Sequence, residues 1–157
     1  SLDILIRGGV SDDRRLYETF DAMSGEFAVI MHVGGAGTDP GDRCSPAMLA
    51  EIVKQFPRLD LIACHFGGYK RFEEAAEIVI GLPVHLDTSW PPSLATLDPK
   101  RVRQIIEKHG PDRICFASDW PMADPAAEIA AIRDLGLSDE DTDAILGGNL
   151  ARLLGIS

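Results

Sequence analysis

Cysteine is scarce in this sequence, and the three cysteines that occur have no spacing that suggests a shared role. Cys44, Cys64 and Cys115 form neither a CxxC nor a CxxH motif and are odd in number, so neither a disulfide framework nor a thiolate zinc site is indicated. Cys64 and Cys115 lie in apolar runs and are predicted to be core residues. Cys44 lies in a predicted loop, where a reactive thiol is an alternative. Reduced thiols favour a cytoplasmic protein.

Basic residues and long apolar runs are also lacking. The 157 residues include 15 Lys and Arg against 25 Asp and Glu, which gives a net charge of −10, and no stretch is locally basic. Because phosphate backbones repel such a chain, we exclude nucleic acid as a partner. The longest apolar runs, such as residues 27–31 and 78–80, fall far short of the ~18 residues of a membrane span, so no membrane partner is predicted. The chain does not open on a basic segment followed by an apolar one, which also favours the cytoplasm.

Short apolar runs alternate with longer segments of helical periodicity, which is the pattern of consecutive β/α units. The runs are apolar at consecutive positions, as in strands covered on both faces, and this favours a parallel sheet. The composition is that of a globular protein, and no low-complexity tract or Ser/Gly linker divides it, so residues 1–157 are predicted to form a single α/β domain. The predicted strands are Leu2–Ile6, Ala28–His32, Leu59–His65, Val84–Asp87 and Arg113–Ala117.

Helix starts are marked by a capping side chain followed by proline, which lacks the N–H that the first turn leaves unpaired. Three such pairs occur, and Gly110 with Pro111 is predicted to end the second of these helices. The pairs are Ser45-Pro46, Asp98-Pro99 and Asp124-Pro125.

The C-terminal region predicts two further helical segments. Ser138 and Asp141 resemble a capping box and begin a helix that runs through Ile145. Two glycines at 147 and 148 are predicted to separate it from a last turn or two at residues 149–154.

Polar residues stand at the predicted carboxyl ends of four strands, where parallel α/β proteins bind their ligands. His32 and His65 each end a strand and precede glycines, while Asp87 and Asp119 end two others. If these strands are adjacent and parallel, the four side chains converge on one rim of the sheet. Imidazole and carboxylate are ligands suited to zinc or a similar divalent ion.

Each of these residue types also has a structural interpretation. A single histidine after a strand is commonly a hydrogen-bonded loop residue, and it is the convergence of several polar residues that favours a site. His85 and His109 are predicted to be structural, because one lies within a strand and the other on a helix face. Glycines at 34, 35 and 37 lack the GxGxxG pattern and a P-loop lysine, which disfavours a phosphate cradle. Trp90 and Trp120 either wall an apolar pocket or pack within their loops.

Four segments carry a family likeness: HFGG at 65–68, DTS at 87–89, GPDRICFASDWP at 110–121 and ILGGNLARLLG at 145–155. Together they resemble the C-terminal part of the amidohydrolase-related family of metal-dependent hydrolases and decarboxylases, over roughly residues 28–157. The resemblance implies a (β/α)8 TIM-type barrel. The five predicted strands would be strands 4–8 with their helices, so that the chain forms the C-terminal portion of a metal-dependent hydrolase barrel.

The resemblance also implies roles for individual residues. Enzymes of this family hold a divalent metal with a His-x-His pair after strand 1, a histidine after strand 5 and an aspartate after strand 8. By motif position, His32 and Asp119 would be metal ligands, while His65 and Asp119 would be catalytic. The metal implied is zinc, with manganese or another divalent ion as alternatives. His-x-His does not occur in this sequence.

A whole barrel takes about 250 residues, so we expect three β/α units and two metal ligands outside this sequence. The chain is then a segment of a longer protein. The alternative is a natural half-barrel that forms a homo-oligomer or recruits the missing N-terminal half-barrel, because its outer strands would otherwise offer free edges.

The leading functional hypothesis is a metal-dependent hydrolase in which an activated water attacks an amide, ester or lactone carbonyl. One alternative is a metal-dependent carboxy-lyase that acts on an aromatic or muconate-type carboxylic acid. The substrate in either case is a small carbonyl or carboxylate compound, and activity is expected of the complete enzyme. A further alternative is a non-catalytic scaffold or subunit, which the absent His-x-His suggests. The last is an open doubly wound sheet with Asp87 or Asp119 as phosphoacceptor or magnesium ligand.

Overall fold

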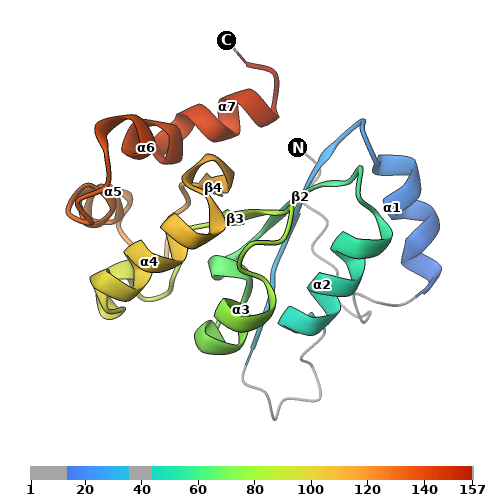
Figure 1. Ribbon diagram of the computed structural model, residues 1–157, viewed down its shortest axis with the longest axis horizontal. Coiled ribbons are helices and arrows are strands. Elements are labelled where there is room, and N and C mark those ends of the chain that lie inside the picture. The colour runs from blue at the N-terminus through green and yellow to red at the C-terminus, as the bar shows by residue number, and fades with distance from the viewer. Residues whose placement is uncertain (1–13, 36–43, 157) are drawn as a thin grey trace.

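Four parallel strands form the sheet in the computed structural model, which describes residues 14–35 and 44–156 (Figure 1). The strands lie in the order in which they occur in the chain, and adjacent strands are all parallel. They confirm four of the five predicted strands and the α/β class, while the predicted strand Leu2–Ile6 lies outside the described residues. The strands are β1 (Ala28–Met31), β2 (Asp60–Ala63), β3 (His85–Asp87) and β4 (Ile114–Cys115).

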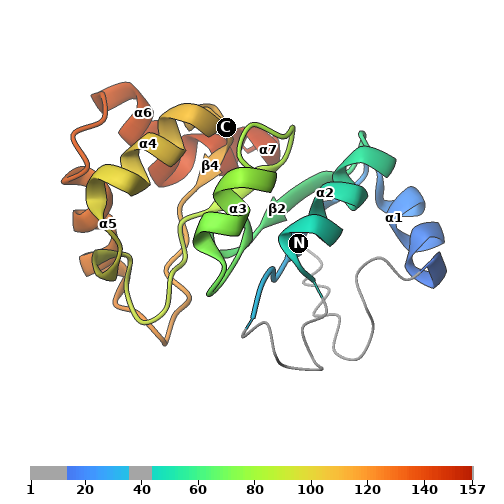
Figure 2. The same ribbon diagram turned by 60° about the horizontal axis from the view of Figure 1, so that its bottom comes forward.

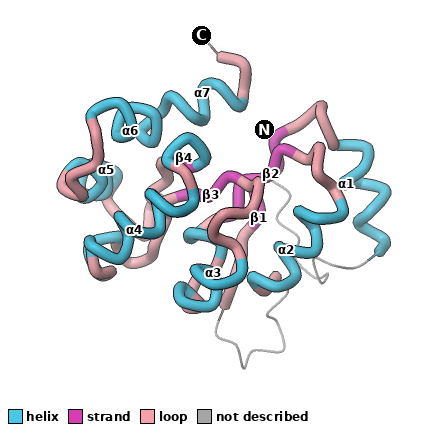
Figure 3. The backbone as a smooth tube through the Cα atoms, viewed as in Figure 1, coloured by secondary structure: helices cyan, strands magenta, loops and turns pink. Residues whose placement is uncertain are grey.

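Helices connect each strand to the next, as β/α units require. Figures 1 and 2 show α1 and α2 at one end of the sheet and α5 and α6 at the other, and Figure 3 shows the short strands in the centre. The α-helices are α1 (Tyr17–Met23), α2 (Pro46–Gln55), α3 (Phe72–Ile78), α4 (Pro99–His109), α5 (Pro125–Arg133), α6 (Asp139–Asp143) and α7 (Asn149–Leu153). Short 3-10 turns occupy Arg14–Leu16, His65–Gly67, Leu94–Thr96 and Pro111–Arg113, and a π-helical turn spans Ala144–Gly148.

One face of the sheet packs against the helices and contains the core. Alternate strand residues such as Val29, Leu61 and Leu86 belong to the same apolar cluster as residues of α2, α3 and α4. Ile62 and Cys115 are also buried but lie outside that cluster, because they point to the opposite face of the sheet. In a barrel, this second face lines the interior.

The predicted helix caps are confirmed. Ser45, Asp98 and Asp124 each accept a hydrogen bond from a backbone N–H in the first turn of α2, α4 and α5, a contact typically worth about 1 kcal/mol. Ser138 caps α6 in the predicted way, since its Oγ accepts from the backbone N–H of Asp141 and donates to that residue's carboxylate. Helices α1 and α3 were not singled out from the sequence, because the residues before them make no side-chain cap.

The predicted break at Gly147 and Gly148 is confirmed. Gly147 has non-helical angles, with a φ of 176° and a ψ of −29°, so the π turn at Ala144–Gly148 contains a kink, and α7 begins after it at Asn149. A π turn withholds a carbonyl from the regular helical ladder, and the carbonyl of Ile145 accepts from the backbone N–H of Phe116 at 2.9 Å. The widened turn therefore binds the C-terminal helices to the sheet.

The outer edge of β4 is covered by these helices, contrary to the expectation of a free edge at this strand. Cys115 faces β3, because its carbonyl accepts from the N–H of Thr88. The backbone N–H and C=O groups of the alternate residues, Ile114 and Phe116, therefore point away from β3, toward the outer edge. The side-chain amide of Asn149 donates to the carbonyls of both Ile114 and Pro111 at 2.7 Å.

None of the helices in the described part of the chain combines the length and hydropathy of a membrane span.

His109 has the structural role that the sequence predicts. It is fully buried at the end of α4, where Nδ1 accepts from the N–H of Gly81 at 3.1 Å and Nε2 donates to the carbonyl of Val84 at 2.8 Å. Burial of the ring lowers the pKa of His109 to about 4. The neutral ring thus joins the end of α4 to the segment before β3.

Replacing Asn149 with Ala should destabilise the chain by about 3 kcal/mol, because one buried and one partly buried carbonyl lose their donor. The free energy of unfolding from urea titration measures the effect. Gln104→Ala, which removes an exposed amide from α4, is the matched control and should change it by less than about 0.5 kcal/mol. Equal effects of the two substitutions would contradict the role assigned to Asn149.

Lowering the pH from about 6.5 to about 4 should remove about 3 kcal/mol of stability through His109 alone. The pKa is depressed in the folded state, so the unfolded chain binds the proton first and stability falls with falling pH in this window. His109→Gln keeps an amide donor and acceptor and should show a smaller loss in urea titrations at these pH values. A ring of His109 that titrates near 6.5 in the folded protein, followed by NMR, would refute this.

Candidate functional site

Two histidines from adjacent strands meet at the carboxyl end of the sheet. His32 directly follows β1, and His65 begins the 3-10 turn after β2. Nε2 of His65 lies 3.0 Å from Nδ1 of His32, and the ring centroids are 4.8 Å apart in an edge-on arrangement. The structure therefore brings the side chains of two of the four residues predicted for this rim into direct contact.

The backbone that carries His65 is strained. His65 and Phe66 have φ values of 60° and 52°, in the left-handed region that non-glycine residues rarely adopt. The carboxylate of Asp87 holds this turn, since its Oδ1 accepts from the N–H of His65 at 2.8 Å. The conformation persists because the neighbouring strand fixes it.

A glycine lets the loop after His32 approach the loop after His65. Gly34 forms a bridge to Tyr69, and a Cβ at this position would lie 2.3 Å from the carbonyl oxygen of Tyr69. Its φ of 95° is also unfavourable for other residues. Gly34 is thus required by the close approach of the two loops.

Asp87 lies at this rim, as the sequence predicted, and its carboxylate is bonded to the turn that carries His65 and to Ser89. It is buried, and its Oδ1 accepts from the N–H of His65 and from the N–H and hydroxyl of Ser89, at 2.8, 3.1 and 2.6 Å. Burial raises the pKa of the Asp87 carboxyl, although the bonds from Ser89 and His65 oppose the shift. The Asp87 carboxylate therefore holds His65 through its backbone N–H and through Ser89.

Ser89 is a site residue that sequence reasoning missed. Its Oγ lies 2.9 Å and its carbonyl oxygen 3.1 Å from Nδ1 of His65. The available signal was its position two residues after Asp87, where an extended chain returns to the same side. A continuous path of hydrogen bonds runs from Asp87 through Ser89 and His65 to His32.

Asp119 lies after β4 in a backbone of positive φ and is exposed. Its negative charge, like that of Asp87, acts to raise the pKa of His32, but burial and the neighbouring His65 outweigh them and lower that pKa. Asp119 is thus within electrostatic reach of His32 on the same rim. Within residues 14–35 and 44–156, no group of three His, Cys, Asp or Glu side chains is arranged to hold a metal ion.

Aromatic residues near the histidine pair differ in how exposed they are. The Tyr69 ring centroid lies 5.2 Å from that of His65, and Trp90 packs against Tyr69 and Phe72 at 5.8 and 5.2 Å. Trp90 is only 8% exposed, so it is a packing residue. Trp120, next to Asp119, is 72% exposed and available to a ligand or a partner.

The three cysteines are reduced. Cys44 is buried, and its thiol contacts the sulfur of Met31 at 3.5 Å, so a reactive role in an open loop is not supported. Cys115 is also buried, and burial raises the pKa of its thiol to about 11. Cys64 is half-buried, and the Asp87 carboxylate accepts a bond from it.

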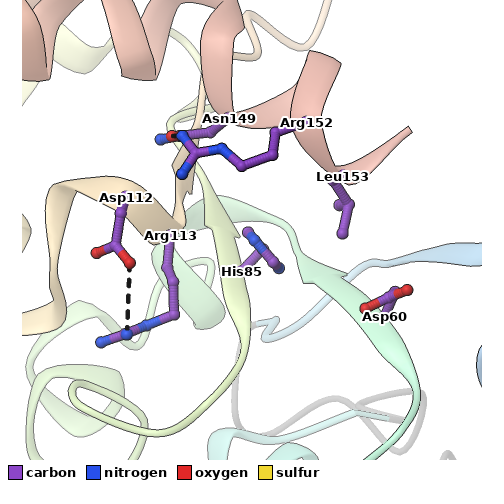
Figure 4. Close-up of a pocket in the computed structure, with 7 residues that line it drawn as sticks. All are labelled: Asp60, His85, Asp112, Arg113, Asn149, Arg152 and Leu153. Atoms are coloured by element: carbon purple, nitrogen blue, oxygen red, sulfur yellow. Dashed lines mark hydrogen bonds and ion pairs between the residues drawn. The ribbon is translucent and has the colours of Figure 1, made fainter. Parts of the chain in front are cut away.

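A polar cavity of about 370 Å³ lies at the opposite end of the strands (Figure 4). Asp60 and His85 are the first residues of β2 and β3, whereas His32 and His65 follow strands. Burial lowers the pKa of His85. The cavity is therefore separate from the histidine pair, and the residues that line it are Asp60, His85, Asp112, Arg113, Asn149, Arg152 and Leu153.

The chain belongs to the amidohydrolase family, because the family profile described as Amidohydrolase matches residues 2–156. No curated protein sequence matches the chain. The family predicted from the four sequence segments is thereby confirmed.

Solved structures show the same fold. An uncharacterized TIM-barrel protein from Bordetella bronchiseptica aligns with a TM-score of 0.72 at 22% identity, over 92% of this chain and 52% of that one. An amidohydrolase from Burkholderia multivorans with bound zinc gives 0.70 at 17% identity, over 94% and 59%. 5-Carboxyvanillate decarboxylase from Sphingomonas paucimobilis gives 0.65 at 19% identity, over 93% and 55%.

The chain spans between about half and three fifths of these structures. Its fold is thus a partial TIM barrel, as predicted.

Proposed function

We propose that residues 1–157 form a single domain, the C-terminal portion of a metal-dependent hydrolase that attacks an amide, ester or lactone carbonyl with an activated water. The observation that carries this proposal is the hydrogen-bonded pair of His32 and His65 at the carboxyl end of a partial barrel, within reach of the charge of Asp119. Ligands bind at this end in TIM-barrel enzymes.

The donor types at this rim fit a divalent metal such as zinc. His32 would contribute an imidazole nitrogen and Asp119 a carboxylate oxygen, and catalytic zinc sites usually have three protein ligands. The remaining ligands would come from β/α units outside this chain, since His-x-His does not occur in it. When bound there, the metal supplies Lewis acidity toward a carbonyl oxygen and a water molecule.

The residues of this chain have distinct tasks in the proposed reaction. His65 would hold or pass a proton at Nε2, because Ser89 engages its other ring nitrogen. Asp119 would orient the water and accept its proton in hydrolysis. Trp120 would offer an apolar wall to a small carbonyl or carboxylate substrate.

Decarboxylation is the second candidate, supported by the structural likeness to 5-carboxyvanillate decarboxylase. The same side chains would bind a carboxylic acid substrate, and an aromatic or muconate-type acid suits a rim that contains Trp120. A non-catalytic scaffold is the third candidate, since the described residues hold no three-ligand cluster.

The partner that best completes the site is an N-terminal half-barrel, with a homo-oligomer as the alternative. β1 ends the described sheet on one side, whereas the outer edge of β4 is bonded to Asn149 and Ile145. A complementary half would pair with β1 and add the missing metal ligands.

The isolated chain should bind zinc weakly, because it offers only two of the ligands. In calorimetric titrations, His32→Ala and Asp119→Ala should each reduce the affinity by at least about tenfold. His85→Ala is the matched control, since this histidine lies at the opposite end of the sheet. Tight stoichiometric zinc binding by the unmodified chain would contradict the assigned ligand set.

The complete enzyme should hydrolyse small amides, esters or lactones without releasing CO₂. His65→Ala should lower kcat by about 10²- to 10⁴-fold, the usual contribution of a general acid or base. Parallel assays on aromatic and muconate-type acids, with CO₂ measured directly, separate the two reactions. CO₂ release would establish the lyase instead, and unchanged turnover in both His32→Ala and Asp119→Ala would leave the metal mechanism without support.

A further inference from the structure

We propose that Ser89 and Asp87 are positioning residues that fix the ring tautomers of His65 and His32, so that Nε2 of His32 keeps a free lone pair. The proposal rests on the proposed function insofar as that lone pair serves a metal ion. The tautomers themselves follow from the hydrogen bonds alone.

The Ser89 hydroxyl donates its hydrogen bond to Asp87. Oδ1 of Asp87 accepts two backbone N–H donors, from His65 and Ser89, so a proton on this carboxyl group would have to sit on the other oxygen. The Ser89 hydroxyl, 2.6 Å from Oδ1, is therefore the donor whichever protonation state Asp87 has. The single hydroxyl proton of Ser89 is committed to Asp87.

Nδ1 of His65 carries a proton, because both of its partners are acceptors. The Ser89 oxygen has given its proton to Asp87 and can only accept at 2.9 Å, and the Ser89 carbonyl at 3.1 Å can never donate. Two acceptors thus converge on one ring nitrogen. Nδ1 of His65 must carry the hydrogen.

The tautomer of His65 determines the tautomer of His32. A neutral His65 with a proton on Nδ1 has a lone pair on Nε2, which lies 3.0 Å from Nδ1 of His32. Nδ1 of His32 then donates, and its own Nε2 is left without a proton. An imidazole oriented through its other nitrogen is the usual arrangement in metal sites.

Asp87, at the end of β3, has two roles in this arrangement. Asp87 both fixes the strained turn that carries His65 and orients the hydroxyl that selects its tautomer. Ser89 and Asp87 need not touch the substrate, so they act through the two histidines.

Nitrogen-15 NMR of the histidine rings tests the assignment in the metal-free chain at pH about 8, where unperturbed histidines are neutral. The sequence has four histidines, and His109 is an internal reference of opposite tautomer, because its Nδ1 accepts and its Nε2 donates. We expect protonated Nδ1 and unprotonated Nε2 at both His65 and His32. A protonated Nε2 on His65, or averaging of its two nitrogens, would overturn the proposal without any variant being made.

Ser89→Ala should shift the His65 and His32 nitrogens toward averaged values, since one of the two acceptors at Nδ1 is lost. Ser89→Thr keeps the hydroxyl and should restore the original shifts. Thr88→Val is the matched control, because this adjacent buried hydroxyl bonds to Ala117 and not to His65. Identical ring shifts in Ser89→Ala and the unmodified chain would overturn the role of the hydroxyl.

In the complete enzyme, Ser89→Ala should weaken zinc binding about 10- to 100-fold, as expected for a group that orients a ligand, while Thr88→Val should not. Different results would refute the proposed function and the positioning role. The predicted tautomers without metal binding at His32 would refute the proposed function alone, and metal binding at His32 with the opposite tautomer would refute the positioning role alone.

Discussion

The carboxylate of Asp87 is the contact on which the rim depends. It is buried at the end of β3 and accepts from the backbone of the turn after β2, so it joins two strands at the point where the chain leaves the sheet. Removal of this acceptor would leave two backbone donors and a hydroxyl unpaired in a buried place. The unfavourable left-handed conformation of His65 and Phe66 persists because this contact stabilises the turn.

The sequence predicted elements whose cause is local. Consecutive apolar residues located β1 to β4, and capping side chains before proline located α2, α4 and α5. Helices α1 and α3 have no such cap, since Leu16 and Arg71 precede them. The glycines at 147 and 148 predicted the break between α6 and α7, whereas the bond from Phe116 to the carbonyl of Ile145 joins residues that are distant in sequence and leaves no local signal.

The site was predictable to the extent that it follows from strand ends. His32 and His65 meet because adjacent parallel strands end at one rim. The orientation of Asp87 could not be read from the sequence, because it depends on which side of the sheet a short strand presents and on the strained turn beside it. Ser89 escaped for the same reason, since its partner comes from another strand.

The two tryptophans differ in exposure, so their intrinsic fluorescence can be distinguished. Trp90 is shielded among Tyr69 and Phe72, whereas Trp120 is open to water beside Asp119. Collisional quenchers such as iodide therefore reach one indole far more readily than the other. Fluorescence from the accessible indole reports on events at the rim, while emission from the shielded one reports on whether the interior stays intact.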